Sequence, residues 1–306
     1  METFFVEYAD LVLRDSDDDD FRAAVRALLD RRHVTSAMDA FIHAAHEGMP
    51  AARMLYIDAS VLKALARASL PGLREDVARE CISTLDHALI IAGAATDDAR
   101  RDYVVHDVIR QLQSVLSWRP PSSAVFVANP ASLPRLLSTS RNAIPALATL
   151  PSIVTAPEHW SRAPFVIPGH ARHWPAMRHW ASLAYLFSVT GPGRTVPVEV
   201  GDDYRSDDWS QKLISWEDFL TFLDPSSISA HRQHQTIYLA QYSLLAQFPQ
   251  LRQDIILPDI VYASLDSPDS PAYEPPSDVI VNAWLGPKGT ISPAHTASSC
   301  ILCQSA

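Results

Sequence analysis

The sequence predicts an α+β protein in which a helical domain precedes a domain built on strands. Apolar residues recur at helical spacing through residues 1–117, which is typical of packed amphipathic helices. Most of the 23 prolines fall after that stretch, where they suit strands and turns better than helices. Between the two, a Pro- and Ser-rich stretch over 118–151 interrupts the helical pattern. We therefore expect a helical domain over 1–117, a linker over 118–151 and a strand-containing domain over 152–306.

The first 117 residues carry four apolar stripes, each of which predicts a helix. The stripes are Phe21, Val25, Leu28 and Leu29; Val61, Leu62 and Leu65; Val77, Cys81, Leu85 and Leu89; and Val104, Val108, Leu112 and Val115. An acidic run over 15–20 precedes the first stripe, where negative charge complements the helix dipole, so we interpret it as a solvated helix start. Thr96-Asp-Asp98 is suited to begin the last helix. Short connections favour antiparallel neighbours and predict a bundle or a repeat-like array.

Strand and helix signals alternate after the linker. Strands are expected over 162–168, 194–200, 237–241 and 279–285, and helices over 177–189 and from Ser215 through Phe222. Ser215-Trp-Glu-Asp218 resembles a capping box. Pro197 indicates that its strand is an edge or an irregular strand, because proline cannot donate to a ladder. Gly286-Pro-Lys-Gly289 predicts a tight turn after the last strand.

Composition excludes several classes of function. A chain of 306 residues with 47% apolar content can bury at least one large core. Its net charge of −10 gives no electrostatic footprint for nucleic acid. No apolar run is long enough for a membrane span, and the N-terminus lacks the basic region of a signal peptide. We expect an intracellular protein of the nucleus or cytoplasm that binds neither membranes nor nucleic acid directly.

Cysteines and scattered histidines predict no site in the helical half. Three cysteines cannot form a disulfide framework, which suits a reducing compartment. Cys300 and Cys303 have redox or zinc spacing but no partner pair, so we interpret them as ordinary small apolar residues. The histidines of the first half, which we interpret as surface or core residues, are His33, His43, His46, His87 and His106.

Four motifs in the second half carry a family resemblance. In chain order they are HWPAMRHW (173–180), RTVPVEVGDDYRSDDWSQKL (194–213), YLAQYSLLAQFPQLRQDIILPD (238–259) and VNAWLGPKGTISPAH (281–295). Together they resemble the JmjC-domain, cupin-like Fe(II)/2-oxoglutarate oxygenase family, closest to its JMJD5-like branch. LYIDASVLKALA (55–66) is similar to the helical domain that precedes JmjC in that branch.

The resemblance implies a fold and a chemistry. The fold would be a double-stranded β-helix, the jelly roll of cupins, and the cofactors Fe(II) and 2-oxoglutarate. Family members hydroxylate protein side chains or demethylate them, so the partner would be a protein. By motif, His295 corresponds to the first iron ligand, and Tyr204 and Ser292 correspond to positions that bind the 2-oxoglutarate carboxylate. From the residues alone, two alternatives remain equally open: Tyr204 as a packed phenol and Ser292 as a turn hydroxyl, neither of which contacts a cofactor.

The sequence departs from the family pattern after His295. The family continues His-x-Asp, but here the carboxylate position is either Ala297 or shifted out of register, and the Asn that assists 2-oxoglutarate binding is missing. A facial triad of two histidines and one carboxylate holds Fe(II) in such sites. Because a jelly roll needs about eight strands, we expect an incomplete jelly roll, truncated within the JmjC domain with its C-terminal strands missing.

Three hypotheses remain open. The first is a JmjC hydroxylase or demethylase whose sequence is truncated or mis-spliced and inactive as written, and whose substrate would be an arginine or methyl-lysine side chain of a protein. The second is a non-catalytic interaction or scaffold protein that uses the helical half to bind a partner. The third is a degraded gene product without function.

Overall fold

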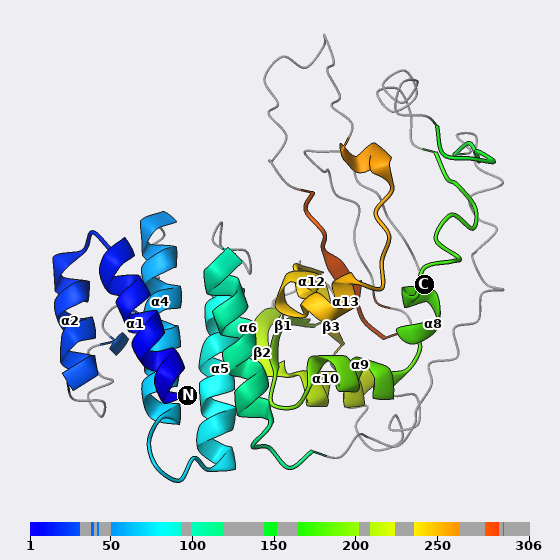
Figure 1. The fold of residues 1–306 in the computed structure, drawn as a ribbon. Helices are drawn as coiled ribbons and strands as arrows, with labels where there is room; N and C mark the ends of the chain where they lie inside the picture. Colours follow the sequence, from blue (N-terminus) through cyan, green and yellow to red (C-terminus); the bar gives the residue numbers. More distant parts are fainter. Residues whose placement is uncertain are drawn as a thin grey trace.

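The computed structural model describes residues 1–30, 38–39, 42, 50–92, 99–118, 144–151, 165–201, 209–223, 236–262, 279–287 and 290. Figure 1 shows an array of helices beside a second part that contains a sheet and several short helices. This arrangement confirms the α+β class and the helical first half.

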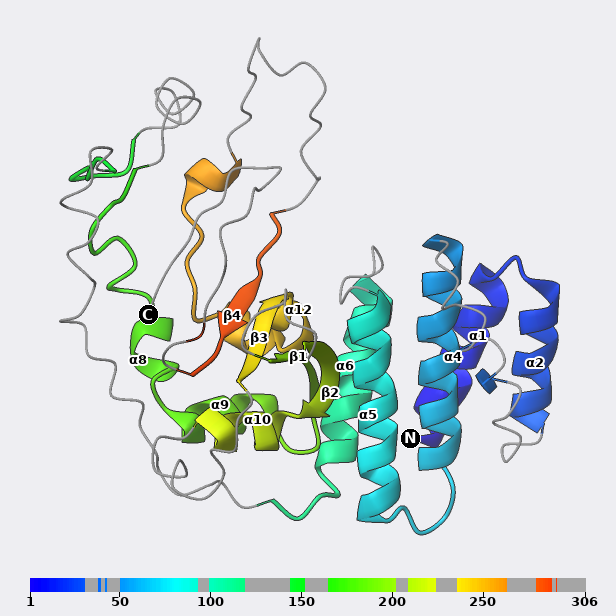
Figure 2. The same ribbon diagram turned by 180° about the vertical axis from the view of Figure 1, so that it is seen from behind.

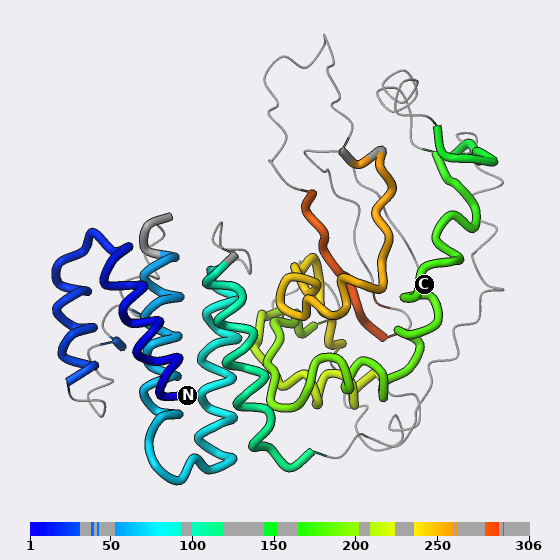
Figure 3. Tube along the Cα trace, viewed as in Figure 1, coloured from blue at the N-terminus to red at the C-terminus, as the bar shows by residue number. Residues whose placement is uncertain are grey.

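Long helices within the described residues make up the first part. They are α1 (Glu2–Asp15), α2 (Asp19–Asp30), α4 (Pro50–Ala68), α5 (Glu75–Ala92) and α6 (Ala99–Gln113). Helix α1 packs against α2 and α4, and α5 packs against α4 and α6. Figure 3 shows α4, α5 and α6 running alongside one another, with α5 and α6 nearest the sheet. The array-like packing predicted from short connections is confirmed for these helices.

The predicted apolar stripes form the core of the helical part. The buried members are Phe21, Val25, Leu28, Val61, Leu62, Leu65, Cys81, Leu85, Leu89, Val108 and Leu112. Leu29, Val77 and Val104 are partly buried against this core, whereas Val115 is 37% exposed. Helix α6 ends at Gln113 and the chain turns there, with the Val115 N–H donating to the carbonyl of Leu112 at 3.1 Å. The helical period therefore stops before Val115, and the prediction for that residue is wrong.

The acidic run before α2 is a helix start, as predicted. The Asp18 carboxylate accepts a hydrogen bond from the Phe21 N–H at 2.8 Å, which caps the helix. Asp19 and Asp20 lie in the first turn, where they complement the dipole. Residues 96–98, predicted to begin the last helix, lie outside the described residues, and α6 is described from Ala99.

A buried carboxylate ties three helices of this part together. Asp58 on α4 accepts hydrogen bonds from the Tyr8 hydroxyl of α1 at 2.7 Å and from Arg101 Nε of α6 at 2.9 Å. Burial raises the pKa of Asp58, although the hydrogen bonds from Arg101 and Tyr8 oppose that shift. A buried charge is tolerated only when it is paired in this way.

The sheet of the second part is antiparallel, with strand order β2-β1-β3-β4. The strands are β1 (Thr195–Val200), β2 (Ser210–Ser215), β3 (Ile237–Tyr242) and β4 (Ala283–Leu285). Figure 2 shows the sheet from behind, where α5 and α6 lie beside its β1–β2 side. Together with the helical first half, this sheet is consistent with an incomplete jelly roll of the cupin type.

One face of the sheet packs on a hydrophobic core. Val196, Val198 and Val200 alternate with half-buried residues along β1 and are buried, as the sequence predicted. Helix α10 (Trp216–Leu223) covers this face with α9 (Leu183–Thr190). The side chain of Ser215 accepts the Asp218 N–H at 3.0 Å, so the predicted helix cap is confirmed. Short helices α12 (Leu244–Gln247) and α13 (Pro249–Arg252) complete the core, and a 3-10 turn, η4 (Asp259–Tyr262), follows.

Several sequence predictions for this part need correction. The helix expected over 177–189 is two helices, α8 (Ala176–His179) and α9, separated by a turn. The strand expected over 162–168 is an isolated bridge between Val166 and Ala146 where it is described. Of the strand expected over 279–285, only Ala283–Leu285 forms a strand, β4. Strand β2 was not predicted.

Pro197 does not mark an edge strand. Strand β1 lies between β2 and β3, yet β3 pairs with it only at Glu199 and Val200. At Pro197 the sole paired neighbour is Leu213 of β2. The missing N–H therefore removes no bond to β3 at that position, which lets proline sit in a central strand.

The described residues bear on two expectations, the absence of a membrane span and the role of the cysteines. There, no helix is both long and apolar enough to cross a bilayer. Cys81 is a buried free thiol whose Sγ lies 3.6 Å from the carbonyl of Ala64. Burial raises its pKa to about 11, so it is an inert core residue. Cys300 and Cys303 lie outside the described residues.

Candidate functional site

The residues predicted to hold cofactors lie outside the described residues. They are Tyr204, Ser292 and His295, and with them Ala297. The strand expected over 279–285, which precedes Ser292 and His295 in the sequence, is described. The candidate site is therefore built here from the sheet on which that strand ends.

The predicted tight turn after β4 is present. The Thr290 N–H donates to the Pro287 carbonyl at 3.1 Å, and the Thr290 hydroxyl donates to the same oxygen at 2.7 Å. A side chain at Gly286 would place its Cβ 2.7 Å from both Thr290 Oγ1 and Tyr238 Cδ2. Glycine is therefore required where the chain leaves β4 close to β3, just before residues 292–295.

The sheet face opposite the core carries one carboxylate and two aromatic rings. Glu199 of β1 is in register with Tyr238 of β3. Trp284 lies between core-packed Ala283 and Leu285 on β4 and is 45% exposed, as expected for a residue that points away from the core. Leu213 of β2 lies on the same face and is 42% exposed. We call Glu199, Leu213, Tyr238 and Trp284 the second face.

Sequence reasoning assigned no role to three members of the second face, Glu199, Leu213 and Tyr238. It placed Val196, Val198 and Val200 on one side of a strand but assigned no role to Glu199 between them. The alternation could have identified Glu199 as a residue on the other side. It assigned no role to Tyr238 either, whose ring lies beside Gly286, while the prediction for Tyr204 lies outside the described residues.

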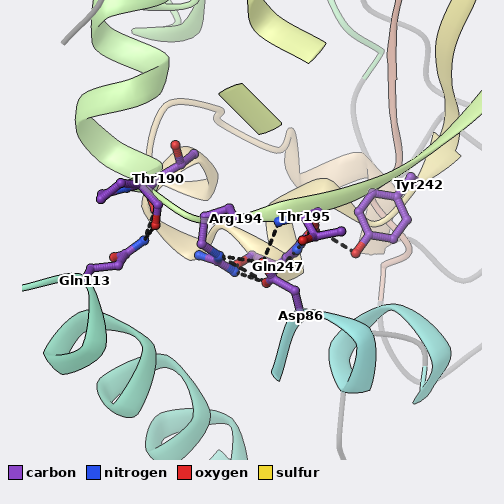
Figure 4. A network of polar contacts seen from close by, with 8 residues as sticks. Asp86, Gln113, Thr190, Arg194, Thr195, Tyr242 and Gln247 are labelled. Atoms are coloured by element: carbon purple, nitrogen blue, oxygen red, sulfur yellow. Dashed lines mark hydrogen bonds and ion pairs between the residues drawn. The ribbon is translucent and has the colours of Figure 1, made fainter. Parts of the chain in front are cut away.

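A buried carboxylate on α5 ties the helical part to the sheet. Asp86 is fully buried and accepts hydrogen bonds from Arg194 Nη2 at 2.6 Å, from the Thr195 N–H at 2.7 Å and from Gln247 Nε2 at 2.7 Å. Figure 4 shows these side chains converging on Asp86. The Arg194 guanidinium also lies over the Phe248 ring, 4.5 Å from its centroid. The start of β1 is thus fixed by the helical part.

A second contact joins the same two parts. Gln113, the last residue of α6, donates from Nε2 to the carbonyls of Thr190 and Pro192, at 2.9 Å each. Gly191 lies between them with φ of +70°, and a Cβ there would be 2.5 Å from the Gln113 amide. Glycine therefore serves both the turn and the close approach of Gln113.

The lowered pKa of His106, on α6, predicts how the stability of the chain depends on pH. Burial, with Arg194 adding to it, lowers the pKa of His106 to about 4, against opposing effects of Asp86 and a hydrogen bond with the backbone of Ala246. The unfolded chain binds this proton near pH 6.5 and the folded chain only near pH 4, so stability falls as the pH drops between those values. We expect His106→Gln to flatten the free energy of unfolding between pH 6.5 and 4.5, measured by urea titration. The surface variant His173→Gln should keep the wild-type slope, and an equal slope in His106→Gln would contradict the prediction.

Two of the quoted motifs meet at a second buried carboxylate, that of Asp254. It accepts from Tyr185 Oη at 2.6 Å and Trp180 Nε1 at 2.8 Å, and lies 3.0 Å from His179 Nδ1. Burial acts to raise the pKa of Asp254, but the hydrogen bonds from Tyr185, His179 and Trp180 outweigh it, and the pKa is lowered. Burial and Asp254 together raise the pKa of Tyr185 to about 12. This cluster fastens the α8–α9 segment to the chain after α13.

The motifs that carry the resemblance are thus parts of one packed unit, and comparisons with known proteins bear on what that unit is. The sequence profile described as "Cupin-like domain" matches residues 159–304. Jumonji C domain-containing protein 5 of Drosophila melanogaster is 41% identical over 145 residues, which is 46% of this chain and 33% of that protein. Lysine-specific demethylase 8 of Danio rerio is 31% identical over 234 residues, 72% of this chain and 52% of that protein. The protein of the same name from Xenopus tropicalis is 38% identical over 160 residues, 51% of this chain and 32% of that protein.

The chain belongs to the JmjC family. It spans about half the length, or less, of these relatives. The resemblance inferred from the four motifs is confirmed at the level of the family and its cupin fold. The domain limits of 1–117, 118–151 and 152–306 and the site residues remain predictions.

JmjC demethylases generally use Fe(II) and 2-oxoglutarate, so the donor set of this chain can be compared with what iron needs. Within the described parts of the chain, no group of three or more His, Cys, Asp or Glu side chains could hold a metal ion. Two positions after His295, the predicted iron ligand, stands Ala297, whose side chain has no lone pair to offer a metal. A facial triad requires a carboxylate there. The residues present do not fit the JmjC iron centre.

Proposed function

We propose that this chain has the fold and substrate class of a JmjC protein hydroxylase or demethylase, and that it recognises a cationic protein side chain without catalysing the oxidation. Relatives named as lysine-specific demethylases support the class. Three features of the chain support the narrower statement: the composition of the second face, the donor set at 295–297 and the rigid attachment of the helical part.

The second face is the observation that carries the substrate class. It places the Glu199 carboxylate in register with the Tyr238 ring, and Trp284 on the neighbouring strand β4. A carboxylate beside aromatic rings suits a cation, because the carboxylate pairs with the charge and the ring faces attract it. An arginine or methyl-lysine side chain of a protein meets both requirements.

The residues at the predicted iron site favour binding of the substrate without its oxidation. Oxygenases of this class hold Fe(II), which supplies the oxidising chemistry, through two histidines and a carboxylate. Ala297 in place of that carboxylate leaves the metal without a required ligand. This favours the second candidate function, a non-catalytic binding protein, for the sequence as written.

The test separates these two parts of the proposal. Binding is measured by calorimetry with three peptides that differ only in one residue: arginine, trimethyl-lysine or glutamine. We expect a cationic peptide to bind about tenfold more tightly than the glutamine peptide, and Glu199→Gln to remove that preference. Asp218→Asn on α10 is the matched control, because it removes an exposed carboxylate elsewhere.

Turnover is followed in the same samples by conversion of 2-oxoglutarate to succinate in the presence of Fe(II). We expect none above the protein-free rate. Succinate formation would overturn the non-catalytic part of the proposal, whereas equal binding of all three peptides would overturn the substrate class.

A further inference from the structure

The corner at the end of β3 has an unusual backbone. The register between β3 and β4 shifts between Leu239 and Tyr242, which marks a bulge or a similar irregularity. Within that interval Gln241 has φ of +44°, the only non-glycine residue with positive φ among those described. A side chain in this region is strained and persists only when the surroundings hold it. Bulges re-aim the side chains that follow them.

A buried amide holds this corner from behind. The Tyr242 hydroxyl donates to Gln247 Oε1 at 2.9 Å, and Gln247 Nε2 donates to Asp86 Oδ1 at 2.7 Å and to the Thr195 carbonyl at 2.8 Å. Gln247 and Asp86 are both fully buried. Figure 4 shows Gln247 between Asp86 and Tyr242. The amide therefore connects the helical part to the corner through bonds that cannot be exchanged for water.

The same corner contacts the segment that leads into β4. Ser243 Oγ lies 3.1 Å from Asn282 Oδ1, immediately before Ala283 begins the strand. Because side chains alternate between the faces of a sheet, a slip of β4 by one residue would turn Trp284 into the core and Leu285 outward. The register of this short strand thus decides which side chains the second face contains.

We propose that Gln247 is a positioning residue, which joins Asp86 of the helical part to Tyr242 and so fixes the β3 corner and the register of β4. This inference rests on the proposed function of the second face, since that face is what the corner would position. It assigns the helical part a role in substrate recognition that involves no contact with the substrate.

Hydrogen exchange followed by mass spectrometry tests the proposal without any ligand. Tyr242→Phe removes only the hydroxyl that donates to Gln247. Gln247→Met removes the amide, and with it the hydrogen bonds to Tyr242, Asp86 and Thr195. We expect Tyr242→Phe, which loses one hydrogen bond, to speed exchange about fivefold in peptides covering β3 and β4. Gln247→Met loses three and should speed it by more, with α1 and α2 unchanged. Tyr185→Phe, which removes a comparable hydroxyl from the Asp254 cluster, should leave β4 unchanged.

A merely stabilising role would raise exchange in all elements together through global unfolding. Unchanged exchange in β4, or an equal rise in α1 and α2, would overturn the proposal. The wild-type chain with the arginine peptide provides the separate arm for function: protection of β4 by the peptide supports the second face as the binding site. If that arm fails while Tyr242→Phe still loosens β4, the proposed function is wrong and the positioning stands. If both variants that loosen β4 also bind the peptide as tightly as wild type, the link to recognition is overturned.

Discussion

Asp86→Ala is expected to lower the free energy of unfolding of this chain by about 3–5 kcal/mol, one of the two largest single-site effects that the structure predicts. The substitution leaves the Arg194 guanidinium, only 4% exposed, without its carboxylate. It also removes the acceptor of the Thr195 N–H and of one Gln247 bond. The large cost arises because each of these donors stays buried when the partner is gone.

Urea titration followed by circular dichroism measures this effect, and two variants interpret it. Asp76→Ala removes an exposed carboxylate that pairs with Arg74 in the first turn of α5, and it should shift the midpoint far less than Asp86→Ala does. The double variant Asp86→Leu/Arg194→Met replaces both charges by apolar groups and should recover most of the loss. A double variant as unstable as Asp86→Ala would mean that the lost acceptor of Thr195 and Gln247, and not the unpaired charge of Arg194, causes the loss.

The sequence predicted those parts of the fold whose pattern is local. Stripes such as Val61, Leu62 and Leu65 follow one face of one helix, and the valines of β1 follow one face of one strand. Strand β2 was not predicted because SQKLIS shows no alternation of apolar and polar residues. The residues in the middle of the strand are exposed. Pairing with β1, and not its own composition, makes it a strand.

Contacts between distant residues were beyond local patterns. Asp86 and Arg194 are separated by 108 positions, and the sequence around one residue does not indicate that it pairs with the other. The same holds for Asp254 and Trp180, which are 74 positions apart, although both lie in motifs that carried the family resemblance. For the site, the resemblance identified the strand that ends at the turn with Gly286 but not Glu199 or Tyr238. Tyr204, Ser292 and His295 lie outside the described residues and remain predictions.

The helical part is therefore more than a neighbour of the sheet. Asp86 of α5 accepts a hydrogen bond from the start of β1, and His106 of α6 is hydrogen-bonded to the backbone of Ala246 on α12. Gln113 of α6 donates to the end of α9 and to the turn that follows it. This arrangement relates the hypothesis of a partner-binding helical half to the second face. A partner that moved α5 would act on Gln247, and through it on β4.

Trp216→Ala is the other large effect, and it separates the support of the sheet from its recognition surface. Trp216 begins α10, is fully buried, and its ring lies 5.3 Å from Phe248 and 5.7 Å from Phe219 between ring centroids. Removing it creates a cavity beneath β1, and we expect a loss of about 3–5 kcal/mol in the free energy of unfolding. Calorimetric or urea unfolding measures the loss.

Two further variants, Trp216→Phe and Trp284→Ala, show whether the loss comes from the buried ring of Trp216. Trp216→Phe keeps an aromatic ring and removes an indole N–H that is buried without a hydrogen-bond partner among the described residues, so it should cost much less than alanine. Trp284→Ala removes the same kind of side chain from the second face, where it is 45% exposed, and should change stability little while weakening peptide binding. If Trp284→Ala unfolded the chain as Trp216→Ala does, the ring of Trp284 would belong to the core, and the second face could not be the surface that receives a substrate.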